Sequence, residues 1–434
     1  MGSARLRDPL RRPAFRRLAI SYAINEMGDW LGLIALSVLV FDRTDSALAT
    51  AALFLGTGVI PALLTPVVVA RLERPAPRFV LPAIYAGEAA AFLGLALLAE
   101  HFSLAVVVAV AAIDGALALT ARTLTRSVTA AMLGPEGELR AGNAILNVAF
   151  TGGAAVAPAA AGGLVAAFGV QSALLLDAVS FYAIGWILFT ARPLPHAEPE
   201  PGRLREQVRA GLAYVRDNVT LKRLIGAEAL ALIFFSAVVP IEVVYAKDSL
   251  DASDTGYGVL LGSWGVGMLF GSLVFARLRR ASLPILLLCS TVAIAGGYLG
   301  MALAPTLAIA CAASAIGGTG NGVQWVAVVS AVQELTVATM QARVISVLES
   351  IASALPAVGF VLGGLIATLY SPRATFAFAG IGVIVVLVLA IPLLGSKWPV
   401  HTAAEAGDTA EADVMVELIP TMPADGRSSP TWRS

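Results

Sequence analysis

The sequence has few charged residues: only 13% of its 434 residues are Asp, Glu, Lys or Arg, about half the share of roughly 25% found in soluble domains. A soluble enzyme of this length would lack the polar surface to cover itself. The chain has only two cysteines and three histidines, without zinc-site spacing, and it carries no Walker loop or catalytic triad. The net charge is zero. We therefore expect no metal, cofactor, enzymatic activity or nucleic-acid partner.

Long apolar stretches are abundant instead, since 58% of the residues are hydrophobic. A membrane-spanning helix needs about 20 apolar residues. The uncharged stretches 141–176 and 281–333 are each long enough for two helices, with breaks near Gly169 and at Ala304-Pro305. The pattern predicts an all-α integral membrane protein with twelve spans. They run over roughly 17–41, 47–71, 79–99, 103–126, 141–167, 171–191, 221–246, 255–276, 282–303, 306–333, 342–369 and 373–395.

The distribution of basic residues predicts the orientation of the chain, because cytoplasmic loops carry an excess of Lys and Arg. With both termini in the cytoplasm, only Arg43, Lys247 and Arg373 of the 29 basic residues fall outside. We expect the following organisation of the chain. It has a basic arm (1–16), a six-helix unit (17–191), a cytoplasmic loop (192–220), a second six-helix unit (221–395) and a disordered tail (396–434).

The two units resemble each other in sequence. Ala-Arg-Leu-Glu-Arg at 70–74 corresponds to Ala-Arg-Leu-Arg-Arg at 276–280, and both follow the second helix of their unit. Gly-Gly-Leu occurs at 162–164 and again at 363–365. These matches predict a parallel internal duplication.

Several short motifs together resemble the major facilitator superfamily, in the branch of macrolide-efflux and enterobactin-exporter-like proteins. The motifs are Phe15-Arg16-Arg17-Leu18, Gly28-Asp29-Trp30-Leu31, Arg126, Pro135 to Leu139, Gly142-Asn143-Ala144, Pro158 to Gly163, Leu176-Asp177-Ala178, Ser180-Phe181, Gln333 and Arg343-Val344. The resemblance covers about residues 14–395. It implies two pseudo-symmetric six-helix bundles in a bacterial cytoplasmic membrane, which expose a central site alternately to each side.

The loop that this family uses as a charge latch between the halves departs from the usual pattern here. Glu73 stands in place of the usual Asp, one glycine is missing, and Arg78 stands alone. The resemblance implies a cytoplasmic latch formed by Glu73, Arg74 and Arg78.

The fifth predicted span resembles the antiporter motif of superfamily exporters through Gly153, Pro158, Gly162 and Gly163, although Ala157 replaces a glycine. Small residues allow close helix approach and proline bends a helix. The motif favours export, and ordinary tight packing is the alternative.

Placing an ionisable side chain inside a membrane costs free energy, so each such residue needs a structural or functional explanation. Asn25, Glu26 and Asp29 share one face of the first span. Asp29 lies about 18 Å along this helix, near the midplane. The functional hypothesis is a proton or substrate site; the alternative is a structural carboxylate paired with an arginine.

The fourth span carries Asp114, followed by Arg122 and Arg126. The resemblance places the first and fourth helices along the central cavity. An arginine beside a carboxylate keeps it ionised, and loss of the arginine lets it take a proton. This arrangement predicts a proton switch, while headgroup contact is the alternative for Arg126.

Other polar and aromatic positions have weaker signals. Glu349 lies on a cavity-lining helix by resemblance, and Glu88 is expected to face inward or be protonated. Asp177 is expected to make a structural hydrogen bond to the fifth helix. Glu228 and Glu242 are expected to reach the membrane interface. Possible walls for an apolar substrate are Phe234, Phe235, Tyr257, Trp264 and Trp325.

The sequence thus predicts a monomeric, proton-coupled exporter of a small amphipathic or hydrophobic compound, such as a drug, macrolide or siderophore-like molecule. Asp29 and Asp114 are the preferred coupling carboxylates. An importer, an uncoupled facilitator and a non-transporting receptor or scaffold remain as alternatives.

Overall fold

The computed structural model describes residues 8–72, 77–134, 138–190, 204–278 and 281–394, and these residues form helices without any strand. Large apolar side chains lie exposed on the outside of the helices, among them Leu63, Phe168 and Tyr370. A soluble protein rarely shows such extensive apolar surface. This surface fits a lipid environment.

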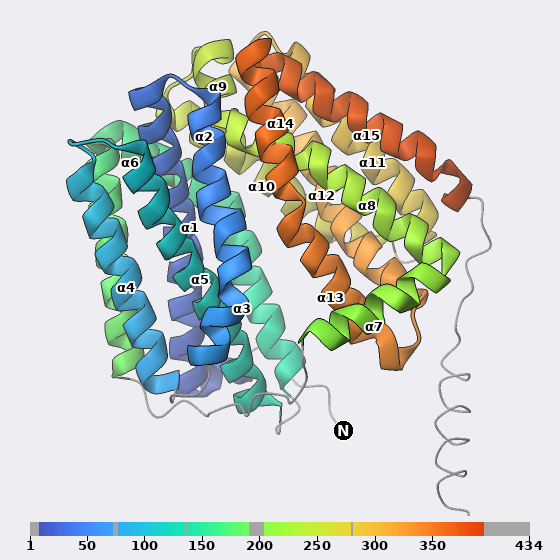
Figure 1. The fold of residues 1–434 in the computed structure, drawn as a ribbon, viewed down its shortest axis with the longest axis horizontal. Coiled ribbons are helices and arrows are strands. Elements are labelled where there is room, and N and C mark those ends of the chain that lie inside the picture. Colours follow the sequence, from blue (N-terminus) through green and yellow to red (C-terminus); the bar gives the residue numbers. More distant parts are fainter. Residues whose placement is uncertain (1–7, 73–76, 135–137, 191–203, 279–280, 395–434) are drawn as a thin grey trace, which may run out of the picture.

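The first half of the chain builds one bundle of long helices (Figure 1). A short 3₁₀ turn, η1, precedes this bundle. The Ser46 side chain caps the start of α2 by accepting a hydrogen bond from the Ala49 amide. The elements are η1 (Pro9–Arg11), α1 (Pro13–Thr44), α2 (Ala47–Phe54), η2 (Leu55–Val59), α3 (Ile60–Leu72), α4 (Pro77–Leu98), α5 (Leu104–Leu133) and α6 (Leu139–Phe189).

The second half builds another bundle and begins with an amphipathic helix inside the predicted 192–220 loop. The elements are α7 (Leu204–Asp217), α8 (Val219–Val238), η3 (Val239–Ile241), α9 (Glu242–Val244), η4 (Tyr245–Ser249), α10 (Asp254–Arg277), α11 (Leu283–Leu303), α12 (Leu307–Glu334), α13 (Ala338–Ala354), α14 (Pro356–Leu369) and α15 (Pro372–Leu394). Pro240 and Pro356 stand where helices break, because proline removes a backbone donor.

Ten helical segments among the described residues are long and apolar enough to cross a membrane. One of them, Ala141–Phe189, covers nearly all of α6, which is interrupted at Gly169, where φ is 78°. That left-handed conformation favours glycine, and the break lies where the sequence predicts it. Helix α12 occupies the predicted tenth span but is not among the ten. The total of twelve spans and the orientation of the termini stay predictions.

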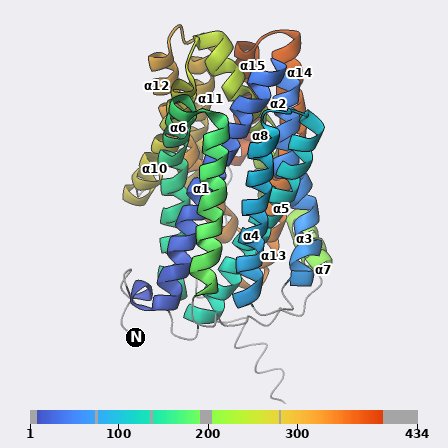
Figure 2. The same ribbon diagram turned by 90° about the vertical axis from the view of Figure 1, so that its left-hand side faces the viewer.

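The two bundles meet through α6 against α10 and α2 against α14 (Figure 1). These contacts hold them together at the end where α2 begins and α14 ends, which we call the joined end. Towards the opposite end, where α1 begins, the ribbons of the two bundles diverge. Figure 2 shows the first bundle from its side, with α1 running its full length.

Candidate functional site

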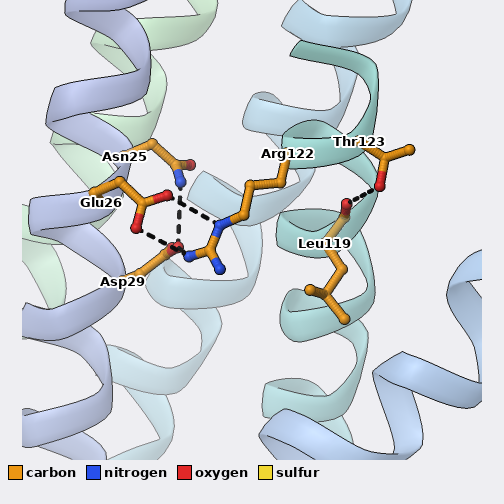
Figure 3. Close-up of polar contacts among 6 residues, drawn as sticks. All are labelled: Asn25, Glu26, Asp29, Leu119, Arg122 and Thr123. Carbon is orange, nitrogen blue, oxygen red and sulfur yellow. Dashed lines mark hydrogen bonds and ion pairs between the residues drawn. The ribbon is translucent and has the colours of Figure 1, made fainter. Parts of the chain in front are cut away.

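A cluster of charged side chains joins α1 to α5 inside the first bundle (Figure 3). Arg122 reaches across from α5 and places its Nε 3.0 Å from Glu26 Oε1 and its Nη2 2.8 Å from Asp29 Oδ2. Asn25 Nδ2 donates a hydrogen bond of 3.2 Å to the same Asp29 oxygen. The predicted residues Asn25, Glu26, Asp29 and Arg122 therefore form one cluster, which we call the Arg122 cluster.

The helical repeat explains why the three α1 residues converge, since positions three and four apart lie on one face. Glu26 is only 1% exposed, whereas the Asp29 and Arg122 side chains are partly exposed. Gly153 of α6 packs against Glu26, because a Cβ atom at Gly153 would lie 3.4 Å from the Glu26 Cβ. A Cβ atom at this position would make an ordinary van der Waals contact with Glu26.

The Arg122 cluster contains two carboxyl groups and one guanidinium group. With all three ionised it carries one surplus negative charge, and burial makes an uncompensated charge costly. A proton or a cationic ligand would balance the cluster. This charge imbalance is the chemical feature that a coupling site requires.

Three further carboxyl groups surround Asp29 and come from three different helices: Glu88 of α4, Asp114 of α5 and Asp177 of α6. Each interacts electrostatically with Asp29. Both Glu88 carboxyl oxygens, one of Asp114 and one of Asp177 are buried without a hydrogen-bond partner in the described chain. The first bundle therefore concentrates acidic groups around a single central arginine.

The sequence prediction that Arg122 acts on its neighbour Asp114 is not what the geometry shows. Arg122 makes its ion pairs with α1, and no contact joins it to Asp114 among the described residues. The two positions on α5 are about 12 Å apart along the helix axis at 1.5 Å per residue. Asp114 interacts electrostatically with Glu88 of α4 and with Asp29 of α1.

Other predicted residues lie apart from the Arg122 cluster. Arg126 is exposed and makes no ion pair with a described residue. Arg78 is also exposed, with its guanidinium 4.6 Å from the Phe79 ring centre. Glu73 and Arg74 lie outside the described residues, as does the side chain of Glu349 on α13. The cytoplasmic latch stays a prediction.

The predicted motif of the fifth span lies where the two bundles meet. A Cβ atom at Gly162 would lie 2.9 Å from the Gly258 Cα atom of α10, and Pro158 also contacts Gly258. Gly262 and Gly265 extend this contact along α10 by packing against the α6 backbone. Sequence reasoning missed these α10 glycines, although their spacing of three to four residues marks one helix face. Gly163, in contrast, has nothing within 4 Å.

Two acidic residues of the second bundle are partly or largely buried, and their predicted position at the membrane interface stays a prediction. Glu228 is 9% exposed and accepts a hydrogen bond of 3.4 Å from Gln324 Nε2. Glu242 is half-buried just after Pro240 and interacts electrostatically with Tyr257 and Tyr298. Asp177 differs from expectation, since it packs against Gly28 and Gly32 of α1 and accepts a hydrogen bond from Ser180.

Two helical bundles joined by close glycine contacts, with apolar outer surfaces and a central charged cluster, define a multi-pass membrane transporter of the major facilitator type. The chain belongs to the family described as transmembrane secretion effectors, which matches residues 6–417. No curated protein matches its sequence.

Solved transporters share the fold at low sequence identity. The nucleoside transporter NupG superposes with a TM-score of 0.73 at 13% identity, covering 88% of this chain and 100% of that one. An inward-facing bacterial homologue of the iron transporter ferroportin superposes with a TM-score of 0.68 at 17% identity, covering 88% of this chain and 99% of that one. A bacterial homologue of the human lysosomal transporter Spinster, also inward-facing, superposes with a TM-score of 0.64 at 14% identity, covering 91% of this chain and 96% of that one. These neighbours and the family are transporters rather than enzymes.

Proposed function

We propose that the protein is a proton-coupled exporter of a small amphipathic or hydrophobic compound. The observation that carries the proposal is Arg122 held between Glu26 and Asp29, two carboxyl groups on one face of α1. The surplus carboxyl group binds a proton in one state and releases it when the Arg122 cluster rearranges or a substrate arrives. An uncoupled facilitator or a receptor has no comparable use for this charge arrangement, whereas an importer would need the same residues and would differ only in the direction of transport.

Asp29 is the preferred proton carrier of the cluster, with Glu26 as its partner and Asp114 as a secondary site. Asp29 is more exposed than Glu26, so a proton reaches it more readily. Asn25 orients the Asp29 carboxylate through their hydrogen bond. Arg122 favours the ionised form of both carboxyl groups by its charge. Displacement of Arg122 thus drives proton uptake.

The transport cycle in this proposal moves the two bundles about the α6–α10 contact. The basic-residue distribution supports termini in the cytoplasm, so the joined end faces the outside and the conformation is inward-facing. The protein acts as a monomer in a bacterial cytoplasmic membrane. The family description as secretion effectors and the antiporter-like motif of the fifth predicted span, which lies in α6, support export rather than import.

The test is dye efflux in everted membrane vesicles energised by a pH gradient. The wild-type protein is expected to move the dye, and this movement is expected to stop when the pH gradient is collapsed. Asp29→Asn and Glu26→Gln are expected to abolish gradient-driven movement. Glu228→Gln, which changes a buried carboxyl group outside the Arg122 cluster, serves as the matched control and is expected to retain it.

Transport that ignores the gradient and survives both substitutions would identify an uncoupled facilitator and overturn the coupling proposal. Movement of the compound in the opposite direction under the same gradient would identify an importer. Proton release on substrate addition to purified protein provides a second readout. It is expected in wild type and in Glu228→Gln, and it is expected to disappear in the Glu26→Gln, Asp29→Asn double variant.

A further inference from the structure

A pocket lies in the first bundle between α1 and the two arms of α6. The break at Gly169 separates these arms, which cover residues 139–168 and 170–189. Figure 2 shows α1 and α6 running alongside each other in this bundle. The pocket has a volume of about 220 Å³. Its polar groups are Asp177 and Ser180, and its apolar walls include Ile24, Leu31, Ala161 and Leu164.

The pocket opens towards the lipid rather than towards the second bundle. Met27 and Leu176 line it and are 49% and 47% exposed on the outside of the bundle. The first arm of α6 contacts α10 through Gly162. The lining residues Ala160 and Leu164 each lie two positions from Gly162, about 200° around the helix at 3.6 residues per turn. A compound dissolved in the membrane therefore reaches the pocket without passing between the bundles.

The buried wall of the pocket carries the carboxyl group of Asp177, whose exposed fraction is 0%. Two glycines of α1 make room for it. A Cβ atom at Gly28 would lie 2.5 Å from Asp177 Oδ1, and a Cβ atom at Gly32 would lie 2.8 Å from Oδ2. Any other residue at these two positions would push the carboxyl group away. The glycine pair thus holds an acidic group against the apolar pocket.

The Asp177 carboxyl group has only part of the hydrogen bonding that it needs. Its Oδ1 atom lies 3.2 Å from the Ser180 hydroxyl. That hydroxyl has one proton to donate, and it also lies 2.9 Å from the Asp177 carbonyl oxygen. The Oδ2 atom is buried without a hydrogen-bond partner among the described residues. A buried carboxyl group in this condition is costly and is stabilised by a cationic donor.

The pocket and the Arg122 cluster lie on neighbouring faces of α1. Gly28 packs against Asp177, and the next residue, Asp29, pairs with Arg122. Consecutive residues of a helix point about 100° apart. Arg122 is already engaged by Glu26 and Asp29, so the partner that Asp177 lacks has to come from a ligand.

The pocket's size and chemistry define the class of ligand. Its volume corresponds to about seven water molecules at roughly 30 Å³ each, which suits one aromatic ring or a short alkyl chain. The apolar walls favour such a hydrocarbon group. A protonated amino group offers up to three donors and a positive charge, so it can satisfy the free Asp177 oxygen with a charge-assisted hydrogen bond. A neutral ligand would leave that carboxyl group without a countercharge.

We propose that this pocket binds the amino end of a lipophilic amine that enters from the membrane. The inference rests on the proposed transport function and names its substrate class and a site of entry. Asp177 supplies the countercharge, the Ser180 hydroxyl accepts a second hydrogen bond from the amine, and the apolar walls hold the hydrocarbon group.

The test is equilibrium dialysis of radiolabelled phenylbutylamine against the purified full-length protein in lipid nanodiscs, without any proton gradient. Empty nanodiscs measure the partition of the amine into lipid. The wild-type protein is expected to bind the amine above this background. Phenylbutanol, which has the same hydrocarbon group without the charge, is expected to compete at least about tenfold more weakly.

Two substitutions separate the charge of the pocket from its space. Asp177→Asn is expected to weaken amine binding about tenfold and to remove the preference for the amine over the alcohol. Ala160→Phe fills the pocket and is expected to weaken binding of both compounds at least about fivefold. Val156→Phe, at a 60% exposed position of the same arm outside the pocket, is the control for Ala160→Phe. Glu228→Gln is the control for Asp177→Asn, and both controls are expected to bind like wild type.

Three results would overturn the inference: no binding by wild type above the empty nanodiscs, equal competition by the alcohol, or equal losses in Ala160→Phe and Val156→Phe. Thermal unfolding of each variant shows whether a loss reflects misfolding, and Ala160→Phe keeps the test decisive if Asp177→Asn unfolds. Because the assay needs no gradient, failure of proton coupling leaves it unaffected. Binding without gradient-driven efflux would contradict the proposed function and leave the pocket supported, whereas efflux of dye without amine binding would overturn the pocket alone.

Discussion

The Lys247 ammonium lies 2.5 Å from the Asp42 carboxylate, and this contact joins the second bundle to the first. Lys247 also lies 2.9 Å from Asp254 at the start of α10. One lysine thus holds two carboxylates, one from each bundle, at the joined end. The neighbouring cation Arg43 differs, because it donates a hydrogen bond to the Ala99 carbonyl within its own bundle.

Lys247→Glu is expected to weaken closure of the joined end by replacing attraction with repulsion. Partly exposed ion pairs contribute about 0.2–1 kcal/mol, so the opening equilibrium should shift by up to about fivefold. The reporter is Ala47→Cys at the buried contact between α2 and α14, in a background where Cys289 and Cys311 are serine. Its labelling by an impermeant maleimide is expected to accelerate.

The charge exchange Asp42→Lys with Lys247→Asp provides the control for this prediction. It restores opposite charges across the bundles and should return labelling towards the wild-type rate. Arg43→Gln should leave the rate unchanged. Equal labelling of wild type and Lys247→Glu, or no recovery in the exchanged variant, would show that the pair does not stabilise the joined end.

The adjacent glycines Gly162 and Gly163 offer a matched pair for testing the bundle contact. A Cβ atom at Gly162 would lie 2.9 Å from Gly258, whereas a Cβ atom at Gly163 would meet nothing within 4 Å. Overpacking costs about 1–3 kcal/mol, so Gly162→Ala is expected to favour separation of α6 and α10. Gly163→Ala should be neutral or slightly stabilising, since alanine favours helix.

The measurement is the same Ala47→Cys labelling, combined with dye efflux in vesicles. When Gly162→Ala is added to the Ala47→Cys protein, the cysteine is expected to be labelled about fivefold faster or more, and most transport is expected to be lost. Gly163→Ala should match its parent in both assays. If the two substitutions behave alike, the contact between Gly162 and Gly258 does not determine closure.

The boundaries of some helices were predictable from the sequence because apolar length is a local property, whereas the splitting of the predicted span 342–369 into α13 and α14 was not. The predicted span 255–276 compares with α10 at Asp254–Arg277, and the predicted break near Gly169 is present. The amphipathic helix α7 lies within the segment 192–220, for which the sequence predicted only a loop. The proline and charged residues of this segment dominated that prediction. Local patterns thus predict individual elements better than the contacts between them.

The site was predictable only within a single helix. Asn25, Glu26 and Asp29 converge because their spacing fixes a common face, and the structure brings them together. The partner of Arg122 was not predictable from its spacing to Asp114, because a long side chain follows the rotation and packing of neighbouring helices. The partial burial of Glu242 was not predictable for a related reason, because it is a property of the assembled bundle.

Arg122→Gln is the most direct test of the charge balance in the Arg122 cluster. Removing one partner of a buried ion pair costs about 3–5 kcal/mol, and the partial exposure of Asp29 places the expected loss near the lower end. Thermal unfolding of the purified protein measures it. Arg126→Gln, at an exposed arginine without an ion pair to any described residue, should change stability by less than about 0.5 kcal/mol.

The stability deficit of Arg122→Gln is expected to depend on pH in a defined direction. Arg122 favours the ionised forms of Glu26 and Asp29, so its loss matters only where those carboxyl groups would be ionised. The deficit should be full at high pH and should shrink as the pH falls and both groups bind protons. Adding Glu26→Gln and Asp29→Asn to the variant removes the unpaired charges and should recover stability at high pH. A deficit that stays constant with pH, or persists in the triple variant, would mean that Arg122 acts through packing, for instance against the Phe150 ring 5.7 Å away, rather than through charge.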